Sequence, residues 1–144
     1  MDITVNWKSG MSFDANGAAG FTLPIGTSPE FGGDNDGFSP MELVLFALAG
    51  CTGMDVISIL EKKRQDVTGF EVRVHGDRSS THPKVFTDIT VSFVVTGRRI
   101  DPAAVERAVE LSSTKYCPVQ AMLGKAAHIT HQITILEAEA NGNS

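Results

Sequence analysis

Cysteine is scarce in this sequence, with only Cys51 and Cys117 among 144 residues. A chain of this length buries roughly two-thirds of its unfolded surface in one core, so it needs neither disulfide bonds nor a metal ion to fold. The N-terminal residues also lack the basic segment and apolar run of a secretory signal. We therefore expect a cytoplasmic protein, in which the two thiols are either inert packing or redox-active.

Basic residues and long apolar runs are also few. Twelve Lys and Arg face seventeen Asp and Glu, and the formal net charge of -5 opposes the positive surface that a nucleic-acid partner would require. The most apolar stretch, Leu43 to Cys51, is about half the length of a bilayer span and is bracketed by Glu42 and Asp55. We expect no nucleic-acid partner and no association with a membrane.

Motifs for common cofactors are missing as well. The sequence has no G-x-G-x-x-G, Walker or G-x-S-x-G motif, so it indicates neither a nucleotide-binding nor a serine-hydrolase function. The four histidines include no pair spaced to share one helix face. The acidic loop at Asp34 to Gly37 lacks the glutamate that a calcium loop carries at its twelfth position. We expect no metal site and no cofactor.

The strongest local pattern is a helix start at Ser39-Pro40-Met41-Glu42, where a capping serine precedes a proline and a glutamate three residues later closes a capping box. The predicted helix runs to about Arg64, roughly 25 residues or about 38 Å. Its first half is apolar on all sides, so it must be buried on all sides. Because one chain of this size has little mass to surround such a helix, we expect a homodimer that wraps it.

The other elements surround this helix in the sequence. Alternation predicts three antiparallel strands within residues 3–25, a hairpin of strands at 70–74 and 87–95, and a final strand around 129–135. Two helices are predicted between them, starting at Pro102 and Pro118. Because the strands are clustered instead of alternating with helices, we expect an α+β fold with antiparallel sheets around the long helix, forming a single domain over residues 1–144.

The two cysteines occupy different settings. Cys117 precedes Pro118 and is a candidate N-cap, where the helix dipole and Lys115 would lower the pKa of its thiol. Cys51 lies inside the long helix between Gly50 and Gly53, and two helical glycines suggest that a second backbone or a ligand approaches closely. From placement alone, Cys117 is either a reactive thiol or a small cap, and an inert core thiol is the better reading of Cys51.

These two segments together resemble the OsmC-like family, which includes osmotically inducible and organic hydroperoxide resistance proteins. The resemblance rests on Ser39-Pro40-Met41-Glu42-Leu43 through Leu48-Ala49-Gly50-Cys51 and on Lys115-Tyr116-Cys117-Pro118-Val119, and it covers nearly the whole chain. It implies an intertwined homodimer whose long central helices pack beneath wrapped sheets. It also implies that Cys51 attacks a hydroperoxide and that Cys117 resolves the sulfenic acid as a disulfide.

The resemblance is incomplete at the groups that activate the thiol. The family's hydroperoxide reductases use an arginine from the N-terminal strands and a glutamate ten residues before the reactive cysteine. Here the first arginine is Arg64, Met41 occupies the tenth position, and Glu42 lies one residue later. Glu42 is a candidate catalytic carboxylate, with helix capping as its alternative role. Lys8 is a candidate cation for the thiolate of Cys51.

The sequence therefore predicts a thiol peroxidase that reduces organic hydroperoxides or related peroxides through a Cys51-Cys117 disulfide, with a dithiol partner as reductant. Two alternatives remain open. One is a protein that binds a small hydrophobic molecule in an apolar pocket beside Gly50 and Gly53. The other is a dithiol reductase or redox sensor of the same fold, which forms the disulfide without appreciable peroxide turnover.

Overall fold

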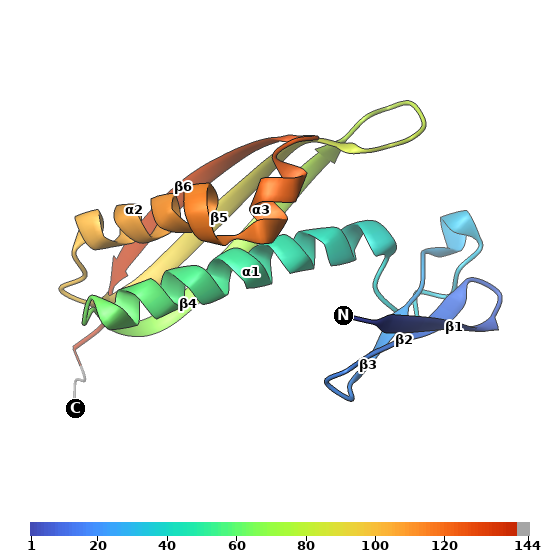
Figure 1. Cartoon of the computed structure of the whole chain (residues 1–144), viewed down its shortest axis with the longest axis horizontal. Helices are drawn as coiled ribbons and strands as arrows, with labels where there is room; N and C mark the ends of the chain where they lie inside the picture. The colour runs from blue at the N-terminus through green and yellow to red at the C-terminus, as the bar shows by residue number, and fades with distance from the viewer. Residues whose placement is uncertain (141–144) are drawn as a thin grey trace. The chain divides into compact units, whose positions relative to one another are not determined.

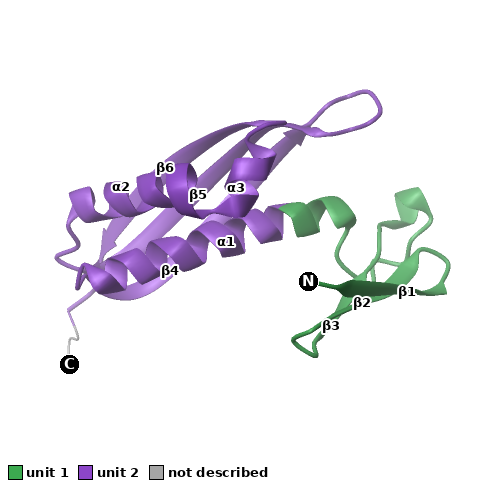
Figure 2. Ribbon diagram, viewed as in Figure 1, with its two compact units in different colours: residues 1–44 green, residues 45–144 purple. Residues whose placement is uncertain are grey.

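The chain folds into two three-stranded sheets and one long helix, with shorter helices near the C-terminal end (Figure 1). The computed structural model describes residues 1–140, and the chain separates into two compact units, residues 1–44 and 45–144 (Figure 2). The mixture of clustered strands and helices confirms the predicted α+β class. The single domain over residues 1–144 stays a prediction.

The first unit is built on an antiparallel meander, as the alternation predicts. Its strands are β1 (Ile3–Ser9), β2 (Ser12–Gly17) and β3 (Thr22–Ile25), in the order β1-β2-β3, followed by a short 3-10 turn, η1 (Pro29–Phe31). β1 is exposed along its whole length, and Trp7 keeps 67% of its surface. Among the described residues, every buried hydrophobic side chain lies beyond residue 44, so this meander has no apolar core of its own.

Helix α1 (Pro40–Lys62) begins where the capping box predicts. The backbone N–H of Ser39 donates to Glu42 Oε2 at 3.0 Å, and the backbone N–H of Glu42 donates to Ser39 Oγ at 3.3 Å. These two bonds satisfy donors that the first turn of a helix otherwise leaves unpaired. The helix ends before Arg64, whose φ of 56° lies in the left-handed region that stops a helix.

The burial of α1 differs from the expectation. Leu48, Thr52, Val56 and Leu60 are buried, and their spacing of four residues makes a single stripe, whereas Met54 is 75% exposed. Within one chain, α1 is therefore covered along one stripe and not on all sides. The predicted burial on all sides requires a second chain, so it stays a prediction. By length and composition alone, α1 is also apolar enough to cross a membrane, but the core helix of a soluble protein passes the same test.

The sheet of the second unit has the order β4-β5-β6, from β4 (Asp66–Arg78), β5 (Phe86–Arg98) and β6 (His128–Glu137). β4 and β5 pair antiparallel, which confirms the predicted hairpin, although both strands are longer than predicted. β5 and β6 pair in parallel, so the prediction of purely antiparallel sheets was wrong. The helices between β5 and β6 carry the chain back to the end of the sheet where β5 begins, as a parallel pair requires.

The core lies between this sheet and the helices. Alternate β5 residues are buried, and α1, α2 (Pro102–Leu111) and α3 (Pro118–Leu123) lie over the same face of the sheet (Figure 1). Asp101 caps α2, since its carboxylate accepts from the backbone N–H of Ala103 at 3.0 Å, as predicted. A π-helical turn, η2 (Ser112–Tyr116), joins α2 to α3. The buried apolar β5 side chains are Phe86, Ile89, Val91, Phe93 and Val95.

Candidate functional site

The fold brings the two cysteines together although they are 66 positions apart in the chain, at 51 and 117. The sulfur atoms of Cys51 and Cys117 and a carboxylate oxygen of Asp55 all lie within 4.8 Å of one another. Both thiols are free, and Cys51 is partly exposed whereas Cys117 is 3% exposed. Two thiols this close need only a small movement to reach disulfide geometry.

The π-helical turn fixes the position of Cys117. The backbone N–H of Cys117 donates to the carbonyl of Ser112 at 2.9 Å, the five-residue bond that defines such a turn. The next helix then starts on Cys117, because the backbone N–H of Gln120 donates to the cysteine sulfur at 3.3 Å. The predicted N-cap role of Cys117 is confirmed.

The predicted low pKa of Cys117 is wrong. Burial and the neighbouring Cys51 thiol raise the pKa of Cys117 to about 11, against the opposing effect of hydrogen bonds from the backbone of Gln120 and Val119. The hydrogen bonds at the start of the helix therefore lower the pKa of Cys117, but burial raises it by more. Lys115 is not among the causes of this shift, and its ammonium lies over the Tyr116 ring, 5.2 Å from the centroid.

Asp55 completes the site through a buried hydrogen-bond chain. Ser112 Oγ donates to Asp55 Oδ2 at 2.8 Å and lies 2.8 Å from Thr52 Oγ1. Ser112 and Thr52 are almost completely buried, so this chain is screened from solvent. Sequence reasoning missed its role: the spacing of four residues from Cys51 places Asp55 on the same helix face, but a carboxylate there is not the cation that would activate a thiol.

A second polar contact supports the short helix that carries Cys117. His131 of β6 lies with its Nε2 3.2 Å from Gln120 Oε1, and its ring stacks on Phe93 with centroids 6.2 Å apart. Burial lowers the pKa of His131, so its imidazole is neutral near pH 7. The hydrogen bond between Gln120 and His131 therefore ties the helix after Cys117 to the sheet, while the ring contact joins β6 to β5.

The two helical glycines have different surroundings. A Cβ atom added at Gly53 would lie 3.3 Å from Val72 Cγ2 of β4, so the close approach at Gly53 comes from a strand side chain instead of a ligand or a second backbone. A Cβ atom added at Gly50 would meet nothing within 4 Å among the described residues. The close neighbour expected at Gly50 is therefore not supplied by the described part of this chain.

The remaining predicted residues lie in the first unit. The carboxylate of Glu42 closes the capping box with Ser39, which is the alternative role that the sequence left open, and its catalytic role stays a prediction. Lys8 Nζ lies 3.8 Å from Asp14 Oδ1 in an exposed ion pair between β1 and β2. Its role as a cation for Cys51 likewise stays a prediction.

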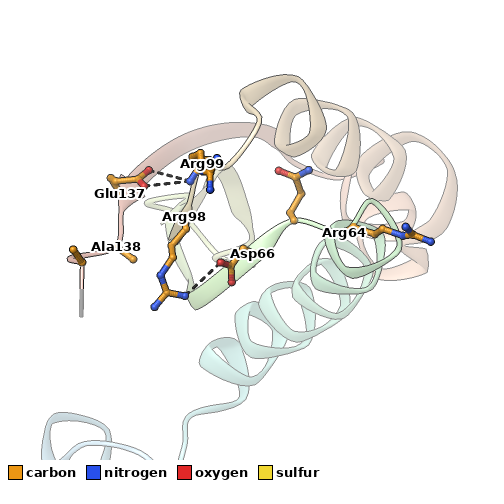
Figure 3. A pocket seen from close by; sticks show the side chains of 8 residues that line it. Arg64, Asp66, Arg98, Arg99, Glu137 and Ala138 are labelled. Atoms are coloured by element: carbon orange, nitrogen blue, oxygen red, sulfur yellow. Dashed lines mark hydrogen bonds and ion pairs between the residues drawn. The ribbon is translucent and has the colours of Figure 1, made fainter. Parts of the chain in front are cut away.

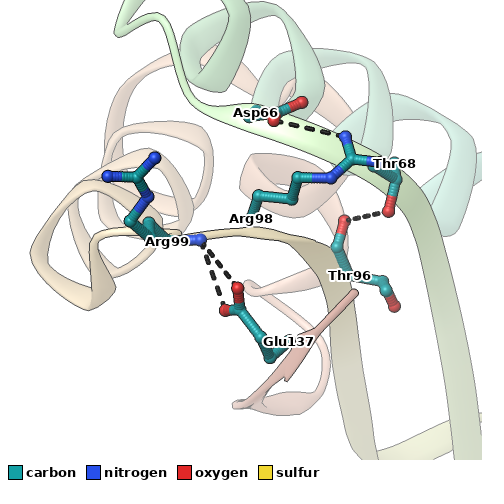
Figure 4. A network of polar contacts seen from close by, with 6 residues as sticks. All are labelled: Asp66, Thr68, Thr96, Arg98, Arg99 and Glu137. Atoms are coloured by element: carbon teal, nitrogen blue, oxygen red, sulfur yellow. Dashed lines mark hydrogen bonds and ion pairs between the residues drawn. The ribbon is translucent and has the colours of Figure 1, made fainter. Parts of the chain in front are cut away.

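A pocket of about 600 Å³ at the far end of the second sheet is the competing candidate site (Figure 3). Its charged groups are largely engaged in holding the strand ends together: Arg98 pairs with Asp66 at 3.3 Å, and the Glu137 carboxylate accepts from the backbone N–H of Arg99 at 3.2 Å (Figure 4). Neither cysteine lines this pocket. We therefore place the chemistry at Cys51, Asp55 and Cys117.

Comparisons with known proteins agree with this fold. Residues 33–132 match the family described as OsmC-like protein. Protein YhfA of Escherichia coli (strain K12) is 44% identical over 138 residues, which cover 96% of this chain and all of that protein. A hypothetical protein from Aquifex aeolicus VF5, of known structure, is 30% identical with a TM-score of 0.84, and the match covers 96% of this chain and 97% of that one.

A more distant solved structure shares the fold alone. It is described as an organic hydroperoxide resistance protein OsmC, predicted redox protein, regulator of sulfide bond formation, from Legionella pneumophila. It is 14% identical with a TM-score of 0.70, and the match covers 92% of this chain and 95% of that one. The family match and the close relatives, together with two neighbouring cysteines on the expected elements, show that this chain belongs to the OsmC-like protein family.

Proposed function

We propose that this protein is a two-cysteine thiol peroxidase that reduces organic hydroperoxides in the cytoplasm. The observation that carries the proposal is the approach of the Cys51 and Cys117 sulfur atoms to within 4.8 Å, from elements far apart in the sequence. Solved relatives whose descriptions name organic hydroperoxide resistance support this substrate class.

Exposure and protonation assign the two cysteines to different roles. A hydroperoxide must reach the attacking sulfur, and Cys51 is partly exposed whereas Cys117 is buried. With its pKa raised to about 11, Cys117 is a protonated thiol near neutral pH and a poor first nucleophile. Cys51 is therefore the attacking thiol and Cys117 the resolving thiol, which is the order that the family resemblance implies.

The proposed reaction has three steps. The Cys51 sulfur attacks one peroxide oxygen, the O–O bond breaks, and the products are Cys51 sulfenic acid and an alcohol. The Cys117 thiol then attacks the sulfenic sulfur, which forms the disulfide and releases water. Finally, an external dithiol reduces the disulfide, returning both protein thiols while the donor becomes a disulfide.

Asp55 is positioned to take the proton from Cys51 in the first step. Ser112 holds Oδ2 of the carboxylate by a hydrogen bond, which leaves the other oxygen available toward the thiols. We therefore infer that Asp55 accepts the proton as the peroxide is attacked and passes it to the departing alkoxide.

The test is peroxide consumption with a dithiol donor, combined with mapping of the oxidised cysteines by mass spectrometry. We expect Cys51→Ser to abolish turnover and Cys117→Ser to accumulate Cys51 sulfenic acid without an intramolecular disulfide. Normal turnover by Cys51→Ser would refute the mechanism. A disulfide with negligible peroxide turnover would identify a dithiol reductase or sensor, and a co-purified ligand without any disulfide would identify a binding protein.

We also propose that the functional unit is a homodimer. Two apolar surfaces support this: the side of α1 that carries the exposed Met54, and β1, which carries the exposed Trp7. We expect Met54→Lys to reduce the sedimentation coefficient to that of a monomer, whereas Glu106→Lys, on the exposed side of α2, leaves it unchanged. A wild-type protein that sediments as a monomer would refute the proposed assembly.

A further inference from the structure

We propose that Cys51, Asp55 and Cys117 form a binding site for a thiophilic divalent cation of the zinc class when the cysteines are reduced. The three side chains offer two sulfur ligands and one oxygen ligand, with the ligand atoms all within 4.8 Å of one another. The sequence predicts no metal site, because no local spacing shows that Cys117 lies beside Cys51 and Asp55. This metal site uses the same residues as the proposed peroxidase. Its effect on peroxide reduction, described below, rests on that proposed function.

The ligand set and its spacing suit this class of ion. Thiolates select soft or borderline ions, and zinc accepts a carboxylate oxygen beside them. In a tetrahedral zinc site the ligand atoms lie about 3.5 to 3.8 Å apart, so atoms within 4.8 Å of one another need to close by at most about 1.3 Å. Cys51 and Asp55, four residues apart on α1, already present their ligand atoms on one face of the helix. Three protein ligands leave the fourth position to water.

The residues that form hydrogen bonds with the ligands orient them as a metal site requires. Ser112 donates to Asp55 Oδ2 at 2.8 Å, which orients the carboxylate and leaves its other oxygen for the ion. The backbone N–H of Gln120 donates to the Cys117 sulfur at 3.3 Å, a bond that stabilises a metal-bound thiolate. Contacts of this kind fix ligand orientation, and their loss typically weakens metal affinity 10- to 100-fold.

Charge also favours a cation here. Fully deprotonated, the three ligands carry three negative charges, and among the described residues Asp55 has no salt-bridge partner within 4.0 Å. A divalent ion bound with loss of two thiol protons neutralises most of this charge. Metal binding at this site therefore releases protons and strengthens as the pH rises.

Metal binding and peroxide reduction then oppose each other. A thiolate that shares a lone pair with the ion is a weaker nucleophile toward peroxide, and the disulfide leaves only Asp55 as a ligand. The ion would protect the thiols from oxidation, and peroxide would act on the metal-free protein. The site then has three states: a metal-bound dithiolate, a metal-free dithiol and a disulfide.

The experiment titrates Co²⁺ and then Zn²⁺ into the full-length reduced protein, with optical absorption and a competing chelator as readouts. We expect one ion per chain, sulfur-to-cobalt charge-transfer bands, and the intense d–d bands of a tetrahedral site. Asp55→Asn and Ser112→Ala should weaken affinity, the latter 10- to 100-fold. Asp88→Asn, which changes an exposed carboxylate on β5, is the matched control and should bind as the wild type does.

The results separate this inference from the proposed function. Oxidation of Cys51 and Cys117 to the disulfide should abolish binding, and saturating Zn²⁺ should suppress disulfide formation by peroxide. Equal affinity of the wild type and Asp55→Asn, or of the reduced and disulfide forms, would overturn the metal site. If the metal-free protein forms the disulfide and turns over peroxide yet binds no ion, only the metal site fails. If the ion binds but peroxide yields no disulfide, only the peroxidase proposal fails.

Discussion

The raised pKa of Cys117 makes the stability of the reduced protein depend on pH in the alkaline range. The pKa of this thiol rises from an ordinary 9.0 to about 11 in the folded chain. Between these two values the unfolded chain releases the Cys117 proton while the folded chain keeps it. Since the unfolded state then binds fewer protons, the free energy of unfolding falls as the pH rises.

The expected size of the effect follows from the two pKa values. At pH 8 and below both states keep the proton almost completely, and almost nothing is lost. Between pH 8 and pH 10.5, a shift from 9.0 to about 11 removes about 2 kcal/mol from the free energy of unfolding, and the limit at higher pH is about 3 kcal/mol. Because the thiol lies close to Cys51 and solvent can screen part of the interaction, these values are upper bounds.

The assay is urea unfolding at pH 8 and at pH 10.5 with a non-thiol reductant, comparing the wild type with Cys117→Ala. Lysine and tyrosine residues also titrate in this range, so the difference between the two proteins isolates Cys117. We expect the wild type to lose more stability than Cys117→Ala, with Cys51→Ala showing an intermediate loss because one cause of the shift is removed. An identical loss in the wild type and in Cys117→Ala would refute the reasoning.

Three further predictions concern the scaffold of the site. Phe93→Ala removes a fully buried ring that contacts Phe70 and His131. Urea unfolding should show that the free energy of unfolding falls by about 3 to 5 kcal/mol, and a fall below about 1 kcal/mol would contradict the place of Phe93 in the core. Asp101→Ala removes the cap of α2 and should cost about 1 kcal/mol by the same assay, while Asp101→Asn should retain most of it. The pKa of His131 is lowered by burial, so the folded protein should lose stability as the pH falls below about 6.5; His131→Gln should flatten this acid slope, and an unchanged slope would contradict it.

Much of the fold follows from local signals in the sequence. The capping residues Ser39 and Asp101, each followed by a proline, predict the starts of α1 and α2 because their side chains satisfy nearby backbone donors. Alternation likewise predicts the strands. It does not predict strand direction, since a parallel and an antiparallel neighbour bury the same alternate residues, and so the parallel pairing of β6 with β5 was missed.

The candidate site depends on contacts that no local pattern encodes. The nearness of Cys51 and Cys117 came from the family resemblance, because spacing along the chain says nothing about a contact over 66 residues. Ser112 reaches Asp55 only because a π-helical turn follows it, and its sequence does not distinguish that turn from an ordinary helix end. Burial, which sets the pKa of Cys117, likewise depends on the assembled fold.

The parallel pairing of β5 with β6 also sets the order in which the thiol site can be completed during synthesis. At about 5 to 20 residues per second, the ribosome adds Cys117 about 3 to 13 seconds after Cys51. The β4–β5 hairpin needs only neighbouring sequence, but Ser112 and Cys117 lie in the connection that must cross the sheet before β6 can join β5. A nascent chain therefore carries Cys51 and Asp55 for several seconds before Cys117 exists, and a chain truncated after β5 retains Cys51 without the residue proposed to resolve its oxidation.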